Sequence, residues 1–248
     1  ENPYLDNQLK QLEMQFNATK QRLQNKFGTQ KFIVYFQSFT NTYAPFSTLK
    51  ALYEKALSFD NVIGLSIGTR TDCVTDEILD YLVDLSKDKE IWIEFGIQSF
   101  FDETLININR GDTASNMKYW INRSKEKGLN VCGHLIYGLP NETQEMMLET
   151  FRQTVELKVD SIKFHPLYVV KNTLLTNEFK KGRFIPISEE LYIDTVVKSI
   201  KNLPENISIQ RITAGIDDST LLSPSWCKDK HTQMKNIRLA LEKEGFNY

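Results

Sequence analysis

The chain has 248 residues, of which 41% are hydrophobic and 25% charged, and its formal net charge is −2. This length fits one large α/β domain or two small ones, and the composition is that of a globular protein with a full core. The net charge excludes strong general attraction to nucleic acid but is compatible with a local basic patch. No apolar run approaches the roughly 20 residues of a membrane span, and no signal peptide opens the chain, so we expect a cytoplasmic protein without a membrane partner.

The cysteines are three in number, widely separated, and never in a CxxC pair: Cys73, Cys132 and Cys227. An odd, scattered set does not predict a disulfide framework. The residues alone therefore predict no metal or cluster site.

Apolar runs alternate with segments of helical periodicity along the chain. A helix is predicted over 4–27, with Gly28 as its stop. A later helix is expected to be capped by Thr75, with Asp76 and Glu77 in its first turn. The predicted strands cover 32–36, 62–67, 91–97, 131–136, 160–164 and 207–212, and the helices that follow them cover 47–57, 75–86, 114–127, 143–157, 188–201 and 231–244.

Alternation at this spacing predicts βαβ units and a mainly parallel sheet. A helix ahead of the first strand suggests that an earlier strand precedes Glu1, and a closed barrel of eight units needs a longer chain. We therefore expect an α/β fold that forms an open or partial TIM-like barrel. The expected core covers 1–203, and 204–248 is expected to be a strand and helix extension packed on it.

Polar residues gather where the predicted strands end, and this edge is where α/β proteins bind ligands. Gln98 ends one strand, and Arg110 follows it twelve positions later within a helical pattern. An unpaired buried amide costs about 1–3 kcal/mol, so the side chain of Gln98 is expected to hydrogen-bond to a ligand or another group. The guanidinium of an arginine binds carboxylates and phosphates through two parallel hydrogen bonds. The alternative is a glutamine that caps the backbone and an arginine on a helix surface.

Weaker candidates follow the first strands. Gln37 follows the first strand, and the alternative interpretation is that it only stabilises the turn there. Thr69 and Arg70 follow the second strand, where an exposed ion pair of Arg70 with Asp72 is the alternative. Glu94 lies inside an apolar strand, so its carboxylate must face a polar cavity or find a partner.

The later strands carry two histidines and a glycine turn. His134 lies among apolar neighbours, as a core histidine does, whereas His165 beside Pro166 is better placed to face a site. Gly138-Leu139-Pro140 is not a P-loop, because no Gly-Lys-Ser/Thr follows. Gly138 permits close backbone approach to a flat ligand, and the alternative is a tight turn between strand and helix.

At these residues the chain resembles the radical S-adenosylmethionine (SAM) superfamily, and it is similar over 1–227 to the YhcC/YtqA-like subgroup. The resemblance is carried by three groups of residues. They are Gly96-Ile97-Gln98-Ser99 with Arg110, Leu135-Ile136-Tyr137-Gly138-Leu139-Pro140 with Glu142-Thr143, and Phe36-Gln37-Ser38 with Ser66-Ile67-Gly68-Thr69-Arg70.

The resemblance implies a (β/α)6 partial barrel that binds SAM on a [4Fe-4S] cluster and cleaves it reductively to a 5′-deoxyadenosyl radical. In the family three cysteines with CxxxCxxC-type spacing hold the cluster, and that loop is expected to precede Glu1. Gln98 and Arg110 would contact the ribose and the methionine carboxylate. The other cofactor-binding candidates are Gln37, Thr69, Arg70, Glu94, His134, Gly138 and His165.

Two departures from the family pattern stand at this site. Gly68, with Thr69 and Arg70 beside it, replaces an acid, and His134 replaces an aspartate. The resemblance further implies an electron donor such as flavodoxin or ferredoxin and a substrate that we expect to be a tRNA base. The alternative is a non-catalytic α/β module that binds a ligand without a cluster, because no cluster ligand stands in this sequence.

Overall fold

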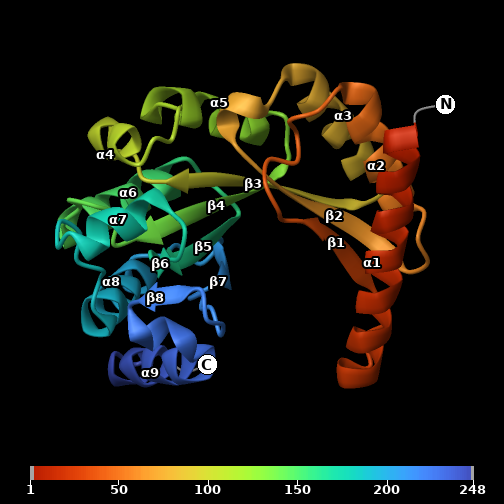
Figure 1. Ribbon diagram of the computed structural model, residues 1–248. Helices are drawn as coiled ribbons and strands as arrows, with labels where there is room; N and C mark the ends of the chain where they lie inside the picture. The colour runs from red at the N-terminus through yellow and green to blue at the C-terminus, as the bar shows by residue number, and fades with distance from the viewer. Residues whose placement is uncertain (1–2, 247–248) are drawn as a thin grey trace. The chain divides into compact units, whose positions relative to one another are not determined.

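The computed structural model describes residues 3–246, in which helices alternate with strands along the chain (Figure 1). The chain forms two compact units, and each is described by itself. The first unit runs to Gly96 and includes Trp120–Val131, and the second comprises Ile97–Tyr119 and the chain from Cys132 onward.

The first unit holds three parallel strands, with β1 paired to β2 and β2 to β3. The strands are rich in Val, Ile and Phe, which suits a sheet that is covered by helices. The predicted parallel pairing is therefore confirmed here. The elements are α1 (Pro3–Phe27), β1 (Phe32–Phe36), α2 (Phe46–Leu57), β2 (Val62–Thr69), η1 (Thr71–Cys73), α3 (Asp76–Ser86), β3 (Glu90–Gln98), which continues into the second unit, and the end of α5 (Ala114–Glu126).

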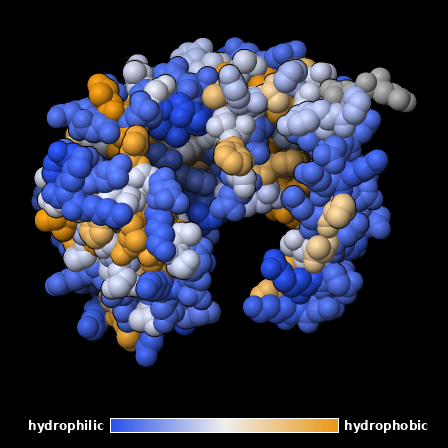
Figure 2. Space-filling model, viewed as in Figure 1, coloured by the Kyte–Doolittle hydropathy of each residue, from blue (hydrophilic) through white to orange (hydrophobic). Residues whose placement is uncertain are grey.

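The long helix α1 lies beside β1, as Figure 1 shows. The ring of Phe16 on α1 stacks on Phe59 at 4.5 Å between centroids and meets Phe32 edge-on at 6.0 Å. None of the residues of α1 is fully buried, and the surface over this helix is largely hydrophilic (Figure 2). The ring of Phe16 thus contacts both β1 and the segment just beyond α2.

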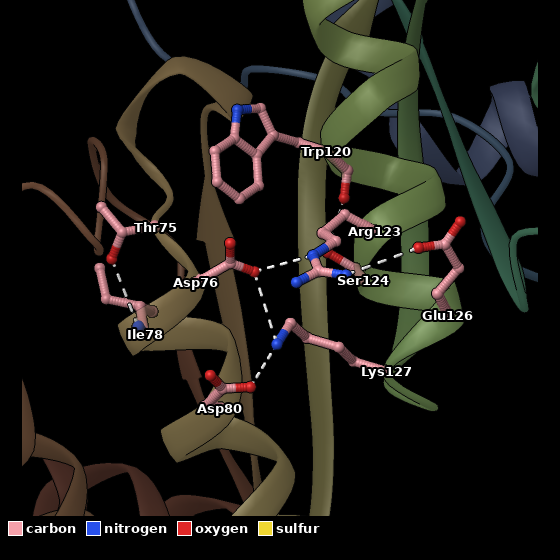
Figure 3. Close-up of polar contacts among 9 residues, drawn as sticks. All are labelled: Thr75, Asp76, Ile78, Asp80, Trp120, Arg123, Ser124, Glu126 and Lys127. Carbon is pink, nitrogen blue, oxygen red and sulfur yellow. Dashed lines mark hydrogen bonds and ion pairs between the residues drawn. The ribbon is translucent and has the colours of Figure 1, made fainter.

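Helices α3 and α5 of the first unit are joined by the ion pairs that Figure 3 draws. Arg123 Nε lies 2.8 Å from Asp76 Oδ1, and Lys127 binds both Asp76 and Asp80. The predicted cap is confirmed, because Thr75 Oγ1 accepts from the amide of Ile78 at 3.3 Å. Exposed pairs of this kind contribute little individually, and a network fixes the register of the two helices.

The second unit holds the parallel strands β4, β5 and β7 and the antiparallel pair β6 and β8. Its core is aromatic: the ring of Phe164 lies 5.4 Å from that of Tyr137 and 6.1 Å from that of Phe151. The elements are α4 (Asp102–Asn107), the start of α5, β4 (Asn130–Tyr137), α6 (Gln144–Glu156), β5 (Ser161–Pro166), β6 (Val169–Val170), α7 (Leu174–Lys180), α8 (Glu189–Lys201), β7 (Ser208–Arg211), β8 (Leu221–Ser223), η2 (Ser225–Lys228) and α9 (Lys230–Lys243).

All six predicted strands exist, as β1, β2, β3, β4, β5 and β7. The short elements α4, α7, β6 and β8 were not predicted, because they span too few residues to show a period. The predicted extension from 204 lies wholly within the second unit, and its status as an appendage stays a prediction. Within the described residues no helix combines the length and apolar character needed to cross a membrane.

Candidate functional site

The carboxyl ends of β1 and β2 are tied together by Asn41. Its Nδ2 donates to the carbonyl oxygens of Phe36 at 3.0 Å and Gly68 at 2.8 Å. A Cβ at Gly68 would lie 3.2 Å from the Phe36 oxygen, so the glycine keeps the two strand ends close. Gln37 follows β1 directly and is exposed, and its ligand contact stays a prediction.

Thr69 and Arg70 make contacts within the protein. Thr69 is buried, and its Oγ1 lies 2.5 Å from Oγ1 of Thr42, which itself donates to the carbonyl of Cys73. Arg70 binds both carboxylate oxygens of Asp72, at 2.8 and 2.6 Å. The alternative weighed for Arg70, an ion pair with Asp72, is therefore what forms, and cofactor contacts of Thr69 and Arg70 stay predictions.

Glu94 on β3 is 1% exposed and accepts a hydrogen bond from the hydroxyl of Ser66 on β2. The sequence required a partner or a polar cavity for this carboxylate, and Ser66 supplies a partner. A role of Glu94 toward a cofactor stays a prediction.

Gln98 ends β3 in a strained conformation. Its φ is +68°, and the amide of Ser99 donates to the carbonyl of Ile97 at 2.9 Å, which defines a tight γ-turn with Gln98 at its centre. Such a turn is rare for a residue with a side chain and is typical of functional sites. Oε1 of Gln98 is buried and has no hydrogen-bond partner within the described part of the chain.

A buried polar network lies directly behind this turn. Ser99 is fully buried and donates from its Oγ to Oε1 of Glu142, and Thr104 on α4 also bonds to this carboxyl. Burial raises the pKa of Glu142, and the two hydroxyl bonds partly offset the rise. Glu142 therefore joins the end of β3, the helix α4 and the turn after β4. Ser99 and Glu142 both stand in the motifs that carry the family resemblance, but no local pattern predicts that they pair.

Arg110 was expected within a helical pattern, and this expectation is wrong. Helix α4 ends at Asn107, and Arg110 is the second residue beyond its C-cap. The amides of Asn109 and Arg110 donate to the carbonyls of Ile106 at 3.0 Å and Leu105 at 2.8 Å, and Asn109 has φ +53°. These bonds form a Schellman motif, which fixes the backbone of Arg110 at the helix end.

The two histidines differ in position. His165 lies next to the end of β5, and its Nδ1 is 2.7 Å from the carbonyl of Pro166. Burial, with smaller contributions from the charges of Arg211 and His134, lowers its pKa to about 4, although the bond to the Pro166 carbonyl opposes the shift. His165 is therefore neutral at pH 7, with the proton on Nδ1 and the lone pair on Nε2. His134 lies inside β4 opposite Lys163, as its apolar neighbours predicted, and its contact with a cofactor stays a prediction.

Gly138 serves the turn after β4. Its φ is +89°, and a Cβ there would lie 2.7 Å from Cβ of Ile187. The side of Gly138 that was expected to admit a flat ligand is thus covered by Ile187. The turn reading is confirmed, and contact between Gly138 and a cofactor stays a prediction.

The side chains at the end of β3 fit SAM, whereas the cysteines do not fit a cluster. The partnerless Oε1 of Gln98 suits a ribose hydroxyl, and Arg110 supplies a guanidinium. Cys132 and Cys227 are fully buried, and burial raises the pKa of Cys227 to about 12, which opposes the thiolate that iron needs. Neither these two nor Cys73 has the CxxxCxxC spacing.

Known proteins match nearly all of the chain. The model of the radical SAM superfamily matches residues 8–154, and the model of the Radical_SAM C-terminal domain matches residues 159–243. YtqA of Bacillus subtilis (strain 168) is 34% identical over 98% of this chain and 75% of its own length. YhcC of Escherichia coli (strain K12) is 38% identical over 87% of this chain and 70% of its own length.

More distant relatives share the fold. The tRNA uridine(34) acetyltransferase of Methanocaldococcus jannaschii is 26% identical over 64% of this chain and 30% of its own length. The structure of archaeal Methanocaldococcus infernus Elp3 with an N-terminal deletion matches 94% of this chain with a TM-score of 0.81 at 21% identity, and this chain spans 59% of it. This likeness shows the expected α/β fold, the partial TIM-like barrel. The chain belongs to the radical SAM superfamily, with YtqA and YhcC among its homologues.

Proposed function

We propose that this chain binds SAM at the carboxyl end of β3 and forms the α/β core of a radical SAM enzyme. The observation that carries the proposal is the strained turn at Gln98, whose buried Oε1 has no hydrogen-bond partner among the described residues. An unsatisfied buried amide oxygen held in a strained turn costs free energy, and a ligand hydroxyl would recover part of it.

Each residue has a distinct role in this proposal. Gln98 accepts a hydrogen bond from a ribose hydroxyl, and the fork of Arg110 binds the methionine carboxylate. The network of Ser99, Glu142 and Thr104 positions the side chains of Gln98 and Arg110. It joins the γ-turn to α4, whose C-terminal motif includes Arg110. These side chains bind and orient the cofactor.

In the superfamily a [4Fe-4S] cluster supplies the electron that cleaves SAM. The cysteines of this sequence do not hold it, so the enzymatic proposal places the ligands on a segment outside this sequence. A SAM-binding module without redox chemistry is the second candidate, and the buried, widely spaced cysteines favour it. We expect this chain alone to purify without iron, and about four irons per chain would overturn our reading of its cysteines.

We propose a tRNA base as the substrate and a flavodoxin or ferredoxin as the electron donor, in the cytoplasm. The relationship to tRNA uridine(34) acetyltransferase supports the choice of tRNA. The net charge of −2 does not support this choice. In the basic turn after α7, Nε and Nη2 of Arg183 each donate to a carboxylate oxygen of Glu178 at 2.7 Å, so this cation is already paired. Filter binding of a tRNA transcript at low and physiological salt tests this choice, and the absence of retention at both would refute it.

Calorimetry with SAM under anaerobic conditions tests the binding proposal. We expect Gln98→Ala to weaken SAM binding by about tenfold, because the loss of one hydrogen bond costs about 1.5 kcal/mol. Gln153→Ala is a matched control, because Gln153 on α6 also buries an Oε1 without a partner among the described residues. Equal affinities of the wild type and the Gln98→Ala variant would sink the proposal, and a loss in both variants would indicate a general folding effect.

Arg110→Lys tests the second contact in the same experiment. An ammonium cannot reproduce the bidentate geometry, and the loss of a charge-assisted bond of about 1.5–3 kcal/mol predicts roughly ten- to a hundredfold weaker binding. A melting curve accompanies the titration. Unchanged affinity with a large drop in Tm would show that Arg110 is structural.

A further inference from the structure

Arg211 ends β7 in the second unit, beside the end of β5. The two strands are parallel, and Lys163 on β5 lies opposite Arg211. His165 is two residues further along β5 and therefore projects to the same face as Lys163, diagonally across from Arg211. Arg211 and His165 thus share the carboxyl edge of a parallel strand pair, where α/β proteins bind ligands.

Three arginines, Arg22, Arg211 and Arg238, make no hydrogen bond or ion pair within the described range 3–246, and Arg22 and Arg238 are exposed. Arg211 as a residue is of intermediate exposure, and the nitrogens of its guanidinium are open to solvent. A half-buried arginine that holds no carboxylate has its guanidinium available to a bound anion. Four other arginines hold carboxylates, in the pairs Arg70–Asp72, Arg123–Asp76, Arg152–Glu149 and Arg183–Glu178.

His165 and Tyr168 stand beside this cation. Their ring centroids are 4.9 Å apart. The Tyr168 hydroxyl has no hydrogen-bond partner among the described residues; burial raises its pKa, whereas the charge of Arg211 lowers it. Oδ1 of the nearby Asp218 accepts hydrogen bonds from the amide and the hydroxyl of Thr220, at 2.7 and 2.5 Å. A donor hydroxyl, a neutral imidazole and a cation therefore meet at one place.

The backbone that carries Arg211 is firmly anchored. The hydroxyl of Tyr192, on α8, donates to the carbonyl of Ile212 at 2.8 Å, and Thr213 donates to the side chain of Gln233 at 2.5 Å. A Cβ at Gly215 would lie 2.4 Å from the carbonyl oxygen of Cys227, so the loop after β7 packs tightly on η2. The strand end is therefore rigid, as a preorganised binding group requires.

We propose that Arg211, His165 and Tyr168 form a subsite for an oxyanion of the substrate, a phosphate or a carboxylate group. Arg211 supplies the bidentate fork, and the Tyr168 hydroxyl donates a further hydrogen bond. His165 donates from Nε2 when the anion raises its affinity for a proton. The subsite goes beyond the proposed SAM binding and stands without it, because it lies on different strands and is tested with different probes.

The test is a titration of this chain with inorganic phosphate, followed by NMR of the ¹³C-labelled histidine rings. The chain has three histidines, so His165 is assigned from the loss of its signal in His165→Gln. We expect saturable shifts of the His165 signal in the wild type. Arg211→Gln should weaken phosphate binding by at least about tenfold. A parallel titration with acetate decides whether the bound group is a phosphate or a carboxylate. A phosphate site discriminates against acetate, and a carboxylate site accepts it.

Arg183→Gln is the matched control, because Arg183 lies in the same unit with its fork already bound to Glu178. It should bind phosphate as the wild type does. Equal phosphate affinity of Arg211→Gln and wild type would overturn the subsite. SAM affinity is measured in parallel and should not change in Arg211→Gln. A selective loss of SAM binding would assign Arg211 to the cofactor and overturn the proposal, whereas a failure of SAM to bind any variant concerns the proposed function alone.

Discussion

Ser99 donates a hydrogen bond to the carboxyl of Glu142, across 43 residues of the chain. Ser99 directly follows the strained residue Gln98, and Glu142 closes the turn after β4 by donating its amide to the carbonyl of Leu139 at 3.1 Å. The bond thus fixes the γ-turn against a second loop of the same unit. Because the carboxyl also bonds to Thr104 on α4, one half-buried acid sets the position of both proposed SAM contacts.

Glu142→Gln should change the pH dependence of stability. The folded pKa of Glu142 is raised from its ordinary 4.5, mainly by burial, so its contribution is fully present at low pH and is lost as pH rises through the folded pKa. The variant cannot ionise, so its stability relative to wild type should improve as pH rises above about 4.5. Urea denaturation between pH 4 and pH 8 measures this.

Glu145→Gln provides a control of opposite sign for this measurement. Hydrogen bonds from its own backbone amide and from Thr143 lower the pKa of Glu145, so its contribution is present above the ordinary pKa and is lost as pH falls. Identical trends for the two variants would contradict the assignment of a raised pKa to Glu142.

Gln98→Gly should separate strain from binding. Glycine adopts φ near +68° without penalty, so Gln98→Gly should be more stable than Gln98→Ala by about 1–2 kcal/mol. Both variants lack the amide and should lose SAM affinity to the same extent. Thermal melting and calorimetry on the pair measure the two effects. If the alanine variant were as stable as the glycine variant, the γ-turn would not be strained as we describe.

Gly138→Ala should destabilise the fold strongly. The substitution combines φ +89° with a Cβ placed 2.7 Å from Cβ of Ile187, so positive φ and overpacking add. Gly182→Ala is the control, because its φ is +69° but nothing lies within 4 Å of the added Cβ. We expect Gly138→Ala to lose about 1–3 kcal/mol more than Gly182→Ala in urea denaturation. Equal losses would mean that Ile187 moves aside without cost.

His165→Gln should flatten the stability profile in mild acid. The pKa of His165 is lowered from 6.5 to about 4, chiefly by burial, so its contribution is complete above 6.5 and is lost as pH falls toward 4. The shift corresponds to roughly 3 kcal/mol between pH 7 and pH 4. Urea denaturation at pH 4.5, 5.5 and 7 compares the two proteins. A wild-type profile as flat as that of the variant would refute the lowered pKa.

The sequence by itself determined the alternation of strands and helices, the parallel pairing within each unit and the cap at Thr75. These features follow from local periodicity and from side chains three residues apart. It also singled out Gln98, because a polar amide at the end of an apolar strand conflicts with its surroundings. Short elements such as α4 escaped detection, and for that reason Arg110 was expected inside a helix.

Only the tertiary structure decided what these polar groups contact. The bond between Ser99 and Glu142 joins residues 43 positions apart, and the contact between Gly138 and Ile187 depends on the approach of a distant loop. It also showed that Arg70 is bound to Asp72 whereas Arg211 has no such partner in the described chain. Periodicity records which face of an element is buried, but the partner of a buried charge is set by how the elements pack, and no local pattern encodes that.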